Sequence, residues 1–249
     1  MQGGLAEHVE AHGSFPALES SGADGLQASA VNDFWESPEN VARFAARAPD
    51  VRLMGLVAGF PDPSVVRVLD LGCAGGRNAD FLARRGFDVR AMDASEAMAA
   101  ETRRRLASHL GDEQAQRRVR VGRMDDLDWA PDASFELVVA LGVYHCAQSV
   151  PEWDRALSET ARVLAPRGKL LVSVFTPETD LTGRGVTPVV GQPHLYEGFE
   201  SGRSVLVDAS TLDSELARHG LSPVVPTSIA RPKVEIGRRV SANGLYVRT

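Results

Sequence analysis

Residues 65–78, which read VVRVLDLGCAGGRN, decide the fold of this chain. Residues 65–70 form a short apolar run rich in β-branched side chains, a pattern that predicts a buried strand. The glycines that follow predict a tight turn into a helix, which carries Phe81 and Leu82 on its apolar side and ends at Gly86. In a doubly wound sheet, such a turn lies at the carboxyl ends of the strands, where ligands bind.

Strands and helices alternate along the rest of the chain. A helix is expected to begin at Ser37-Pro38, and Ser95 is expected to cap another. Two further helices are expected over residues 152–164 and 212–219. This alternation predicts an α/β fold with a doubly wound, mostly parallel sheet. The other expected strands cover residues 87–92, 118–121, 135–141, 169–175, 222–225 and 245–248.

Two segments fall outside this alternation. Residues 1–30 are rich in Gly, Ser, Ala and Glu and lack periodicity, so we expect a flexible tail before one domain over residues 31–249. Residues 176–204 contain several prolines and glycines together with Tyr196 and Phe199. A connection this long predicts a lid or binding loop, and a surface hairpin is the alternative.

Composition narrows the functional class. The 249 residues contain 27 Lys and Arg against 33 Asp and Glu, for a formal net charge of −6, which disfavours a dedicated nucleic-acid binder. The only cysteines are Cys73 and Cys146, which excludes a disulfide framework and a four-thiolate zinc site, and no metal site is predicted. No apolar run is long enough for a membrane span, and the first residues lack a secretory signal, so a cytoplasmic protein is expected.

Two carboxylates mark the predicted ligand site. Asp70 stands just before the glycine turn, where it suits a ligand with a positive group. Ala74 and Arg77 occupy positions at which a dinucleotide fingerprint requires glycine, which disfavours pyrophosphate binding. Asp93 ends the second strand, where a carboxylate can accept hydrogen bonds from ribose hydroxyls. Together they predict a nucleoside ligand with a cationic, amino-acid-like tail; the alternative is that both acids only cap the helices that follow.

Four motifs, in their order along the sequence, resemble those of class I S-adenosylmethionine-dependent methyltransferases. They occupy residues 68–76, 93–98, 134–139 and 162–168. The resemblance implies a Rossmann-like fold with seven strands, of which the seventh is antiparallel. It also implies S-adenosyl-L-methionine as cofactor and transfer of its methyl group to an acceptor, with release of S-adenosylhomocysteine.

The resemblance assigns roles to residues of this chain. It implies that Asp70 anchors the cofactor amino group and that Asp93 binds the ribose. Arg123 stands where many family members have an acidic residue at the adenine amino group, so either Arg123 or Asp125 is expected there. The implied cofactor-binding set is Asp70, Gly72, Cys73, Ala74, Gly75, Gly76, Asp93, Ala94, Met124, Asp125, Leu141 and Gly142.

Tyr144 and His145 follow the fourth strand, where acceptors of this family meet the methyl group, and they are the predicted catalytic residues. His145 has the intrinsic pKa of a general base, and packing is the alternative role. A small-molecule methyl acceptor is expected, with no nucleic-acid or membrane partner, in a monomer or homodimer. Two alternative functions stay open: a non-catalytic S-adenosylmethionine-binding module and a nicotinamide-dependent oxidoreductase.

Overall fold

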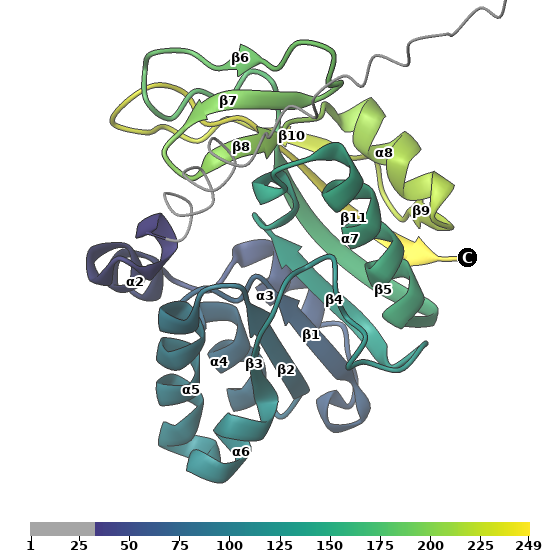
Figure 1. The fold of residues 1–249 in the computed structure, drawn as a ribbon. Coiled ribbons are helices and arrows are strands. Elements are labelled where there is room, and N and C mark those ends of the chain that lie inside the picture. The colour runs from purple at the N-terminus through teal and green to yellow at the C-terminus, as the bar shows by residue number, and fades with distance from the viewer. Residues whose placement is uncertain (1–32) are drawn as a thin grey trace, which may run out of the picture.

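A computed structural model describes residues 33–249, so the whole segment expected to be a tail, residues 1–30, lies outside the described residues. The centre is a mixed sheet with the strand order β3-β2-β1-β4-β5-β11-β10 (Figure 1). The first five of these strands are parallel, and β11 runs antiparallel to β5. The parallel strands are β1 (Arg67–Leu71), β2 (Asp88–Asp93), β3 (Val119–Val121), β4 (Phe135–Leu141) and β5 (Leu164–Phe175).

The remaining strands of this sheet explain why it has eight members rather than seven. Strand β9 (Leu221–Pro223) and strand β10 (Ser228–Ala230) both pair with β11 (Ser241–Arg248). They contact opposite ends of β11, so they are two pieces of one interrupted sixth strand. The predicted mostly parallel sheet with an antiparallel seventh strand is therefore confirmed.

Helices cover both faces of the sheet (Figure 1). One core joins α3, α4, α5 and α6 to one face through residues such as Leu53, Leu82 and Leu106. The other core joins α7 and α8 to the opposite face through Trp153 and Leu212. The helices are α2 (Pro38–Ala45), α3 (Val51–Val57), α4 (Arg77–Arg84), α5 (Glu96–Leu110), α6 (Asp112–Arg118), α7 (Val150–Val163) and α8 (Ala209–Arg218).

Side-chain caps explain where several helices begin. The side chain of Ser37 accepts the Asn40 N–H at the start of α2, and that of Ser95 accepts the Met98 N–H at the start of α5. Both caps were predicted from the sequence. No helix among residues 33–249 is long and apolar enough to cross a membrane.

The segment after β5 forms a second, three-stranded antiparallel sheet at the top of the view in Figure 1. It consists of β6 (Thr187–Pro188), β7 (Leu195–Phe199) and β8 (Gly202–Val205), so the surface hairpin expected as an alternative does form. The Gln148 side chain, which lies just after β4, exchanges two 3.0 Å hydrogen bonds with the backbone of Arg203. This contact fixes the small sheet beside the carboxyl ends of β4 and β5.

Candidate cofactor and acceptor site

The glycine turn after β1 is packed too closely to tolerate larger residues at two positions. Gly72 has a φ of 70°, and a Cβ there would lie 2.6 Å from the Cβ of Val143. A Cβ on Gly75 would lie 2.7 Å from the Cα of Ala45, at the end of α2. The turn is therefore in direct contact with both α2 and the loop that follows β4. These contacts gather three sequence-distant segments around the predicted ligand.

Asp70 lies buried below this turn, and one of its carboxylate oxygens accepts no hydrogen bond from the described residues. Its side chain is 2% exposed, and Oδ2 has no hydrogen-bond partner among residues 33–249. Burial raises the pKa of this carboxyl to about 7, although nearby Arg77 acts in the opposite direction. A buried acceptor without a donor is costly, and an ammonium group would satisfy it. The geometry thus fits the amino group of an amino-acid-like ligand.

Asp93 connects the two predicted cofactor motifs. Its Oδ2 accepts the Ala74 N–H at 2.8 Å, and its Oδ1 accepts the Ser95 N–H at 3.0 Å. The carboxylate thus braces the glycine turn and the start of α5, as the capping alternative expected. Each oxygen keeps a second lone pair for a ligand hydroxyl, so capping and ribose binding are compatible. Burial raises the pKa of Asp93.

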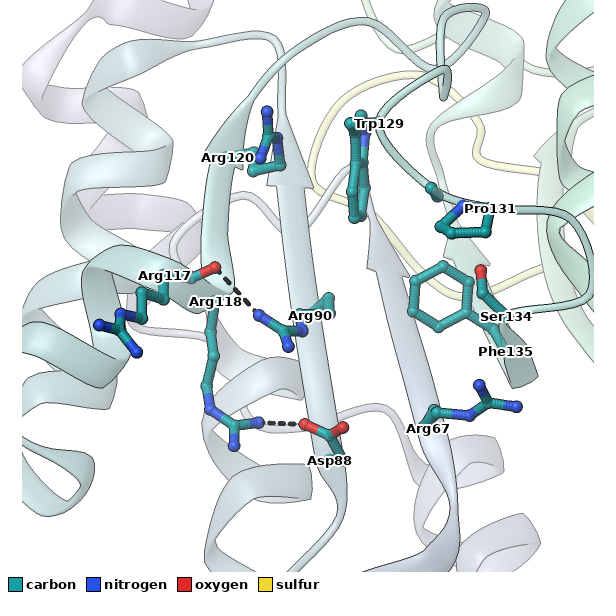
Figure 2. Close-up of a pocket in the computed structure, with 11 residues that line it drawn as sticks. Arg67, Asp88, Arg90, Arg117, Arg118, Arg120, Trp129, Pro131, Ser134 and Phe135 are labelled. Carbon is teal, nitrogen blue, oxygen red and sulfur yellow. Dashed lines mark hydrogen bonds and ion pairs between the residues drawn. The ribbon is translucent and has the colours of Figure 1, made fainter.

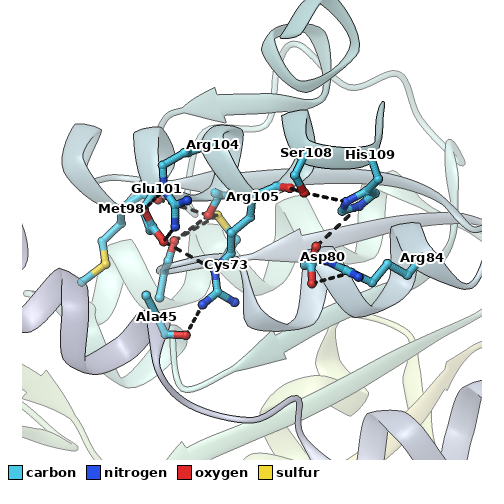
Figure 3. A network of polar contacts seen from close by, with 12 residues as sticks. Ala45, Cys73, Asp80, Arg84, Met98, Glu101, Arg104, Arg105, Ser108 and His109 are labelled. Atoms are coloured by element: carbon cyan, nitrogen blue, oxygen red, sulfur yellow. Dashed lines mark hydrogen bonds and ion pairs between the residues drawn. The ribbon is translucent and has the colours of Figure 1, made fainter. Parts of the chain in front are cut away.

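Helix α5 also holds the far side of the turn (Figure 3). The Thr102 hydroxyl donates to the Ala74 carbonyl at 2.7 Å and lies 3.5 Å from the Cys73 sulfur. Burial raises the pKa of the Cys73 thiol, so this cysteine is a packing residue rather than a nucleophile. Arg105 donates to the Ala45 carbonyl and links α5 to α2. Thr102 and Arg105 were not predicted from the sequence, because a contact between two segments leaves no local signal.

The segment before α2 is likewise attached to α5. The carboxylate of Glu36 accepts the N–H groups of Glu96 and Ala97 at 2.8 and 3.0 Å, and the Ser95 hydroxyl donates to the Trp35 carbonyl. An acid at a helix N-terminus is favourable because it meets unpaired N–H groups and the helix dipole. This places α2 and its flanks next to the cofactor motifs.

The residues predicted around the adenine occupy the loop after β3. Met124 is 8% exposed and belongs to the core, while the carboxylate of Asp125 is held by Arg123 at 3.0 Å and Arg155 at 2.9 Å. Arg123 also pairs with Glu152 at 2.9 Å. Arg123 and Asp125, the two residues considered for contact with the adenine amino group, thus form an ion pair with each other. Any contact of Asp125 with a ligand would come in addition to its two ion pairs.

Tyr144 and His145 form a short 3-10 turn with Cys146 after β4, and the turn sends their side chains in different directions. Tyr144 is 0% exposed, packs edge-on against Trp153, and forms a 2.6 Å hydrogen bond with the Thr160 hydroxyl. Burial raises the pKa of its phenol. These contacts place Tyr144 in the core, and they lend no support to the catalytic role predicted for it.

His145 lies closer to the predicted acceptor position. Its ring stacks on Phe175 with centroids 3.8 Å apart, and its Nδ1 accepts the Phe175 N–H at 3.3 Å. Burial, with a smaller effect of Arg239, lowers its pKa to about 3. The ring is therefore neutral at physiological pH, and its proton is on Nε2. Leu141 and Gly142 precede this turn at the end of β4, with Gly142 donating to the Ser173 carbonyl at 3.0 Å.

A separate cavity of about 390 Å³ opens at the opposite ends of the strands (Figure 2). Arginine side chains and Trp129 line it, and three of the arginines are neutralised by carboxylates in the pairs Arg67–Glu136, Arg117–Glu113 and Arg118–Asp88. It lies at the amino ends of β1, β2 and β4, away from Asp70 and Asp93. The cavity is therefore not the predicted ligand site.

Comparisons with known proteins show similarity to methyltransferases. Residues 68–168 match the methyltransferase domain family. The chain is 31% identical over 195 residues to a demethylmenaquinone methyltransferase of Clavibacter sepedonicus, covering 72% of this chain and 75% of the relative. It is also 31% identical over 148 residues to a ubiquinone biosynthesis O-methyltransferase of Xanthomonas oryzae, and it spans 58% of that relative.

A solved structure shows the same fold at low sequence identity. The 1,6-didemethyltoxoflavin-N1-methyltransferase of Burkholderia thailandensis, crystallised with 1,6-didemethyltoxoflavin and S-adenosylhomocysteine, matches with a TM-score of 0.59 and 21% identity. The match covers 97% of this chain and 93% of that protein. The motifs, the domain match and the curated relatives together identify the chain as a member of the class I S-adenosylmethionine-dependent methyltransferases.

Proposed function

We propose that this enzyme transfers the methyl group of S-adenosylmethionine to a small-molecule acceptor at the carboxyl ends of β1, β4 and β5. The observation that carries the proposal is the buried Oδ2 of Asp70, which has no hydrogen-bond partner in the described part of the chain and lies beside a turn that is braced by Asp93. The bound cofactor supplies an activated methyl group on a sulfonium, so the protein must orient the reactants and exclude water.

The cofactor side of the site uses residues of three loops. Asp70 accepts from the amino group, the backbone of Gly72–Gly76 borders the methionine part, and Asp93 accepts from the ribose hydroxyls. Ala94, Met124 and Asp125 border the adenine, and Leu141 with Gly142 faces the sulfonium. The contacts of Asp93 with Ala74 and Ser95 support this arrangement, because they hold the first two loops together before any ligand binds.

On the acceptor side, His145 orients the acceptor by donating a hydrogen bond from Nε2. The engaged Nδ1 and the lowered pKa support this role over that of a general base. Phe175 stacks on His145 and also on Phe199 of the small sheet, with centroids 6.3 Å apart for the second pair. These rings provide an apolar wall that keeps water from the transferring methyl group.

Binding and turnover together test the proposal. Calorimetry should show that the protein binds S-adenosylhomocysteine and that Asp93→Ala weakens binding at least about tenfold, since two charge-assisted hydrogen bonds are lost. Glu136→Ala, a change of an exposed ion pair at the other end of the sheet, is the matched control. Metabolite extracts supplied with isotope-labelled cofactor should then yield a labelled small molecule by mass spectrometry. No cofactor binding would refute the proposal, and binding without a labelled product from any extract would indicate a non-catalytic module.

A further inference from the structure

The acceptor side of the site carries arginines that form no ion pair with an acid in the part of the chain that the structure describes. Arg239 lies just before β11, and its guanidinium carbon is 5.5 Å from the centre of the Phe175 ring. Phe175 in turn stacks on His145. Arg239 therefore lies at the same aromatic wall that borders the proposed acceptor.

Two more arginines, from other segments, lie near enough for their charges and that of Arg239 to act on one another. Arg77 is the first residue of α4, directly after the glycine turn, and donates to the Ala48 carbonyl at 2.9 Å. Arg47 lies one residue before that carbonyl, with its guanidinium carbon 4.3 Å from the centre of the Phe44 ring. The segment that contains Arg47 and Ala48 also contacts β11, because Arg52 donates to the Asn243 side chain.

No carboxylate within residues 33–249 forms an ion pair with Arg47, Arg77 or Arg239. The acid that acts on Arg239, Asp50, is already bound to Arg52 at 2.7 Å. Partial burial together with Arg77 and Arg52 lowers the pKa of Arg239. Partial burial together with Arg239 and Arg77 lowers that of Arg47. The three positive charges thus destabilise one another, and a bound anion would relieve the repulsion.

The cofactor alone provides too little negative charge, since S-adenosylmethionine has a single carboxylate. We propose that Arg47, Arg77 and Arg239 bind an oxyanion group of the methyl acceptor, a carboxylate or a phosphate. This inference rests on the proposed methyl transfer and defines its substrate class as small organic anions. Guanidinium groups suit it because they hold planar oxyanions through paired, charge-assisted hydrogen bonds.

The test uses the full chain saturated with S-adenosylhomocysteine, titrated with citrate and with inorganic phosphate in a calorimeter. At least one probe should bind saturably, and Arg239→Gln and Arg47→Gln should each weaken it about tenfold or more. Arg85→Gln is the matched control, because Arg85 also lies over a phenylalanine ring, 4.8 Å from the centre of Phe81, on the exposed end of α4. Tighter citrate binding would assign a carboxylate, and tighter phosphate binding would assign a phosphate.

Three results would overturn the inference. The first is that neither probe binds with a Kd below about 10 mM, which corresponds to almost no useful affinity. The second is that Arg239→Gln and the control Arg85→Gln bind the probes equally well. The third is that Arg239→Gln and Arg47→Gln lose affinity for S-adenosylhomocysteine itself, which would assign the arginines to the cofactor carboxylate. Failure of the unaltered protein to bind S-adenosylhomocysteine is a different outcome, because it would refute the proposed function before any probe is added.

Discussion

Asp70→Asn should make the ligand-free protein more stable while it weakens cofactor binding. The carboxyl has a pKa of about 7 in the fold, against 3.8 as its ordinary value. Because the folded pKa is raised, the native state holds a proton more tightly than the unfolded chain, and stability falls as pH rises from about 4 to about 7. At 1.36 kcal/mol for each pH unit, the cost above pH 7 is about 4 kcal/mol.

Asparagine removes this cost but introduces an amide donor at the position of Oδ2. Leaving that donor unpaired costs about 1–3 kcal/mol, so the expected net stabilisation at pH 8 is about 1–3 kcal/mol. For a domain of this size that corresponds to a rise in Tm of roughly 5 °C. The advantage should disappear near pH 4, where the Asp70 carboxyl is protonated in the folded state of the unaltered protein and no charge is buried.

Thermal unfolding without ligand at pH 4, 6 and 8 measures this effect, and calorimetry with S-adenosylhomocysteine measures the loss of affinity. We expect that loss to be about tenfold or more, because an ammonium group then meets a neutral amide. Asp62→Asn, at an exposed cap before β1, is a control that should leave cofactor affinity unchanged. Equal stability of Asp70→Asn and the unaltered protein at pH 8 would refute the idea that a desolvated charge is stored at Asp70.

Gly72→Ala should lower the free energy of unfolding, measured in urea, by about 2–4 kcal/mol, because alanine disfavours the left-handed φ and its Cβ would overlap Val143. If adding Val143→Ala restores none of the lost stability, the clash is not the cause. Tyr144→Phe should lose about 1 kcal/mol by the same measurement and keep its turnover, whereas a large loss of turnover with normal stability would restore a catalytic role. His145→Gln should leave the shape of the pH–rate profile between pH 5 and 8 unchanged, since the lowered pKa keeps the ring neutral there; disappearance of an acidic limb would identify a base. The same lowered pKa predicts that unaltered protein loses stability as pH falls from about 6.5 to about 3, which His145→Gln should reduce.

The helices and strands that could be predicted from the amino-acid sequence are those with a strong local signal. Strand β4 lies at the expected residues 135–141, because every residue there except Glu136 packs on one of the two cores. Helix α6 was missed, since its seven residues contain one buried side chain, Ala115, and so show no apolar periodicity. Strand β10 was missed because its residues are all exposed and are held by backbone pairing with β11.

The residues of the candidate site likewise fall into those that could be predicted from the sequence and those that could not. Asp70 and Asp93 were predictable because adjacent parallel strands bring their carboxyl ends together, whatever the side chains do afterwards. Tyr144 and His145 are neighbours in sequence, and no sequence rule shows that one enters the core and the other stacks on Phe175. Arg239 joins the site from a segment without regular structure, through pairing of β11 with β5. Such long-range placement is visible only after the sheet is assembled.

The buried and partly buried charges of the site predict that ligands stabilise this part of the fold. A desolvated carboxylate at Asp70 and the partly buried guanidinium of Arg239, which forms no ion pair within residues 33–249, each lower the stability of the ligand-free protein. They have opposite signs, yet no ion pair within residues 33–249 joins Asp70 to an arginine. A cofactor ammonium can satisfy Asp70, and an acceptor oxyanion can satisfy the arginines. Each ligand therefore relieves a different electrostatic cost, so the two should stabilise the fold additively unless they also contact one another.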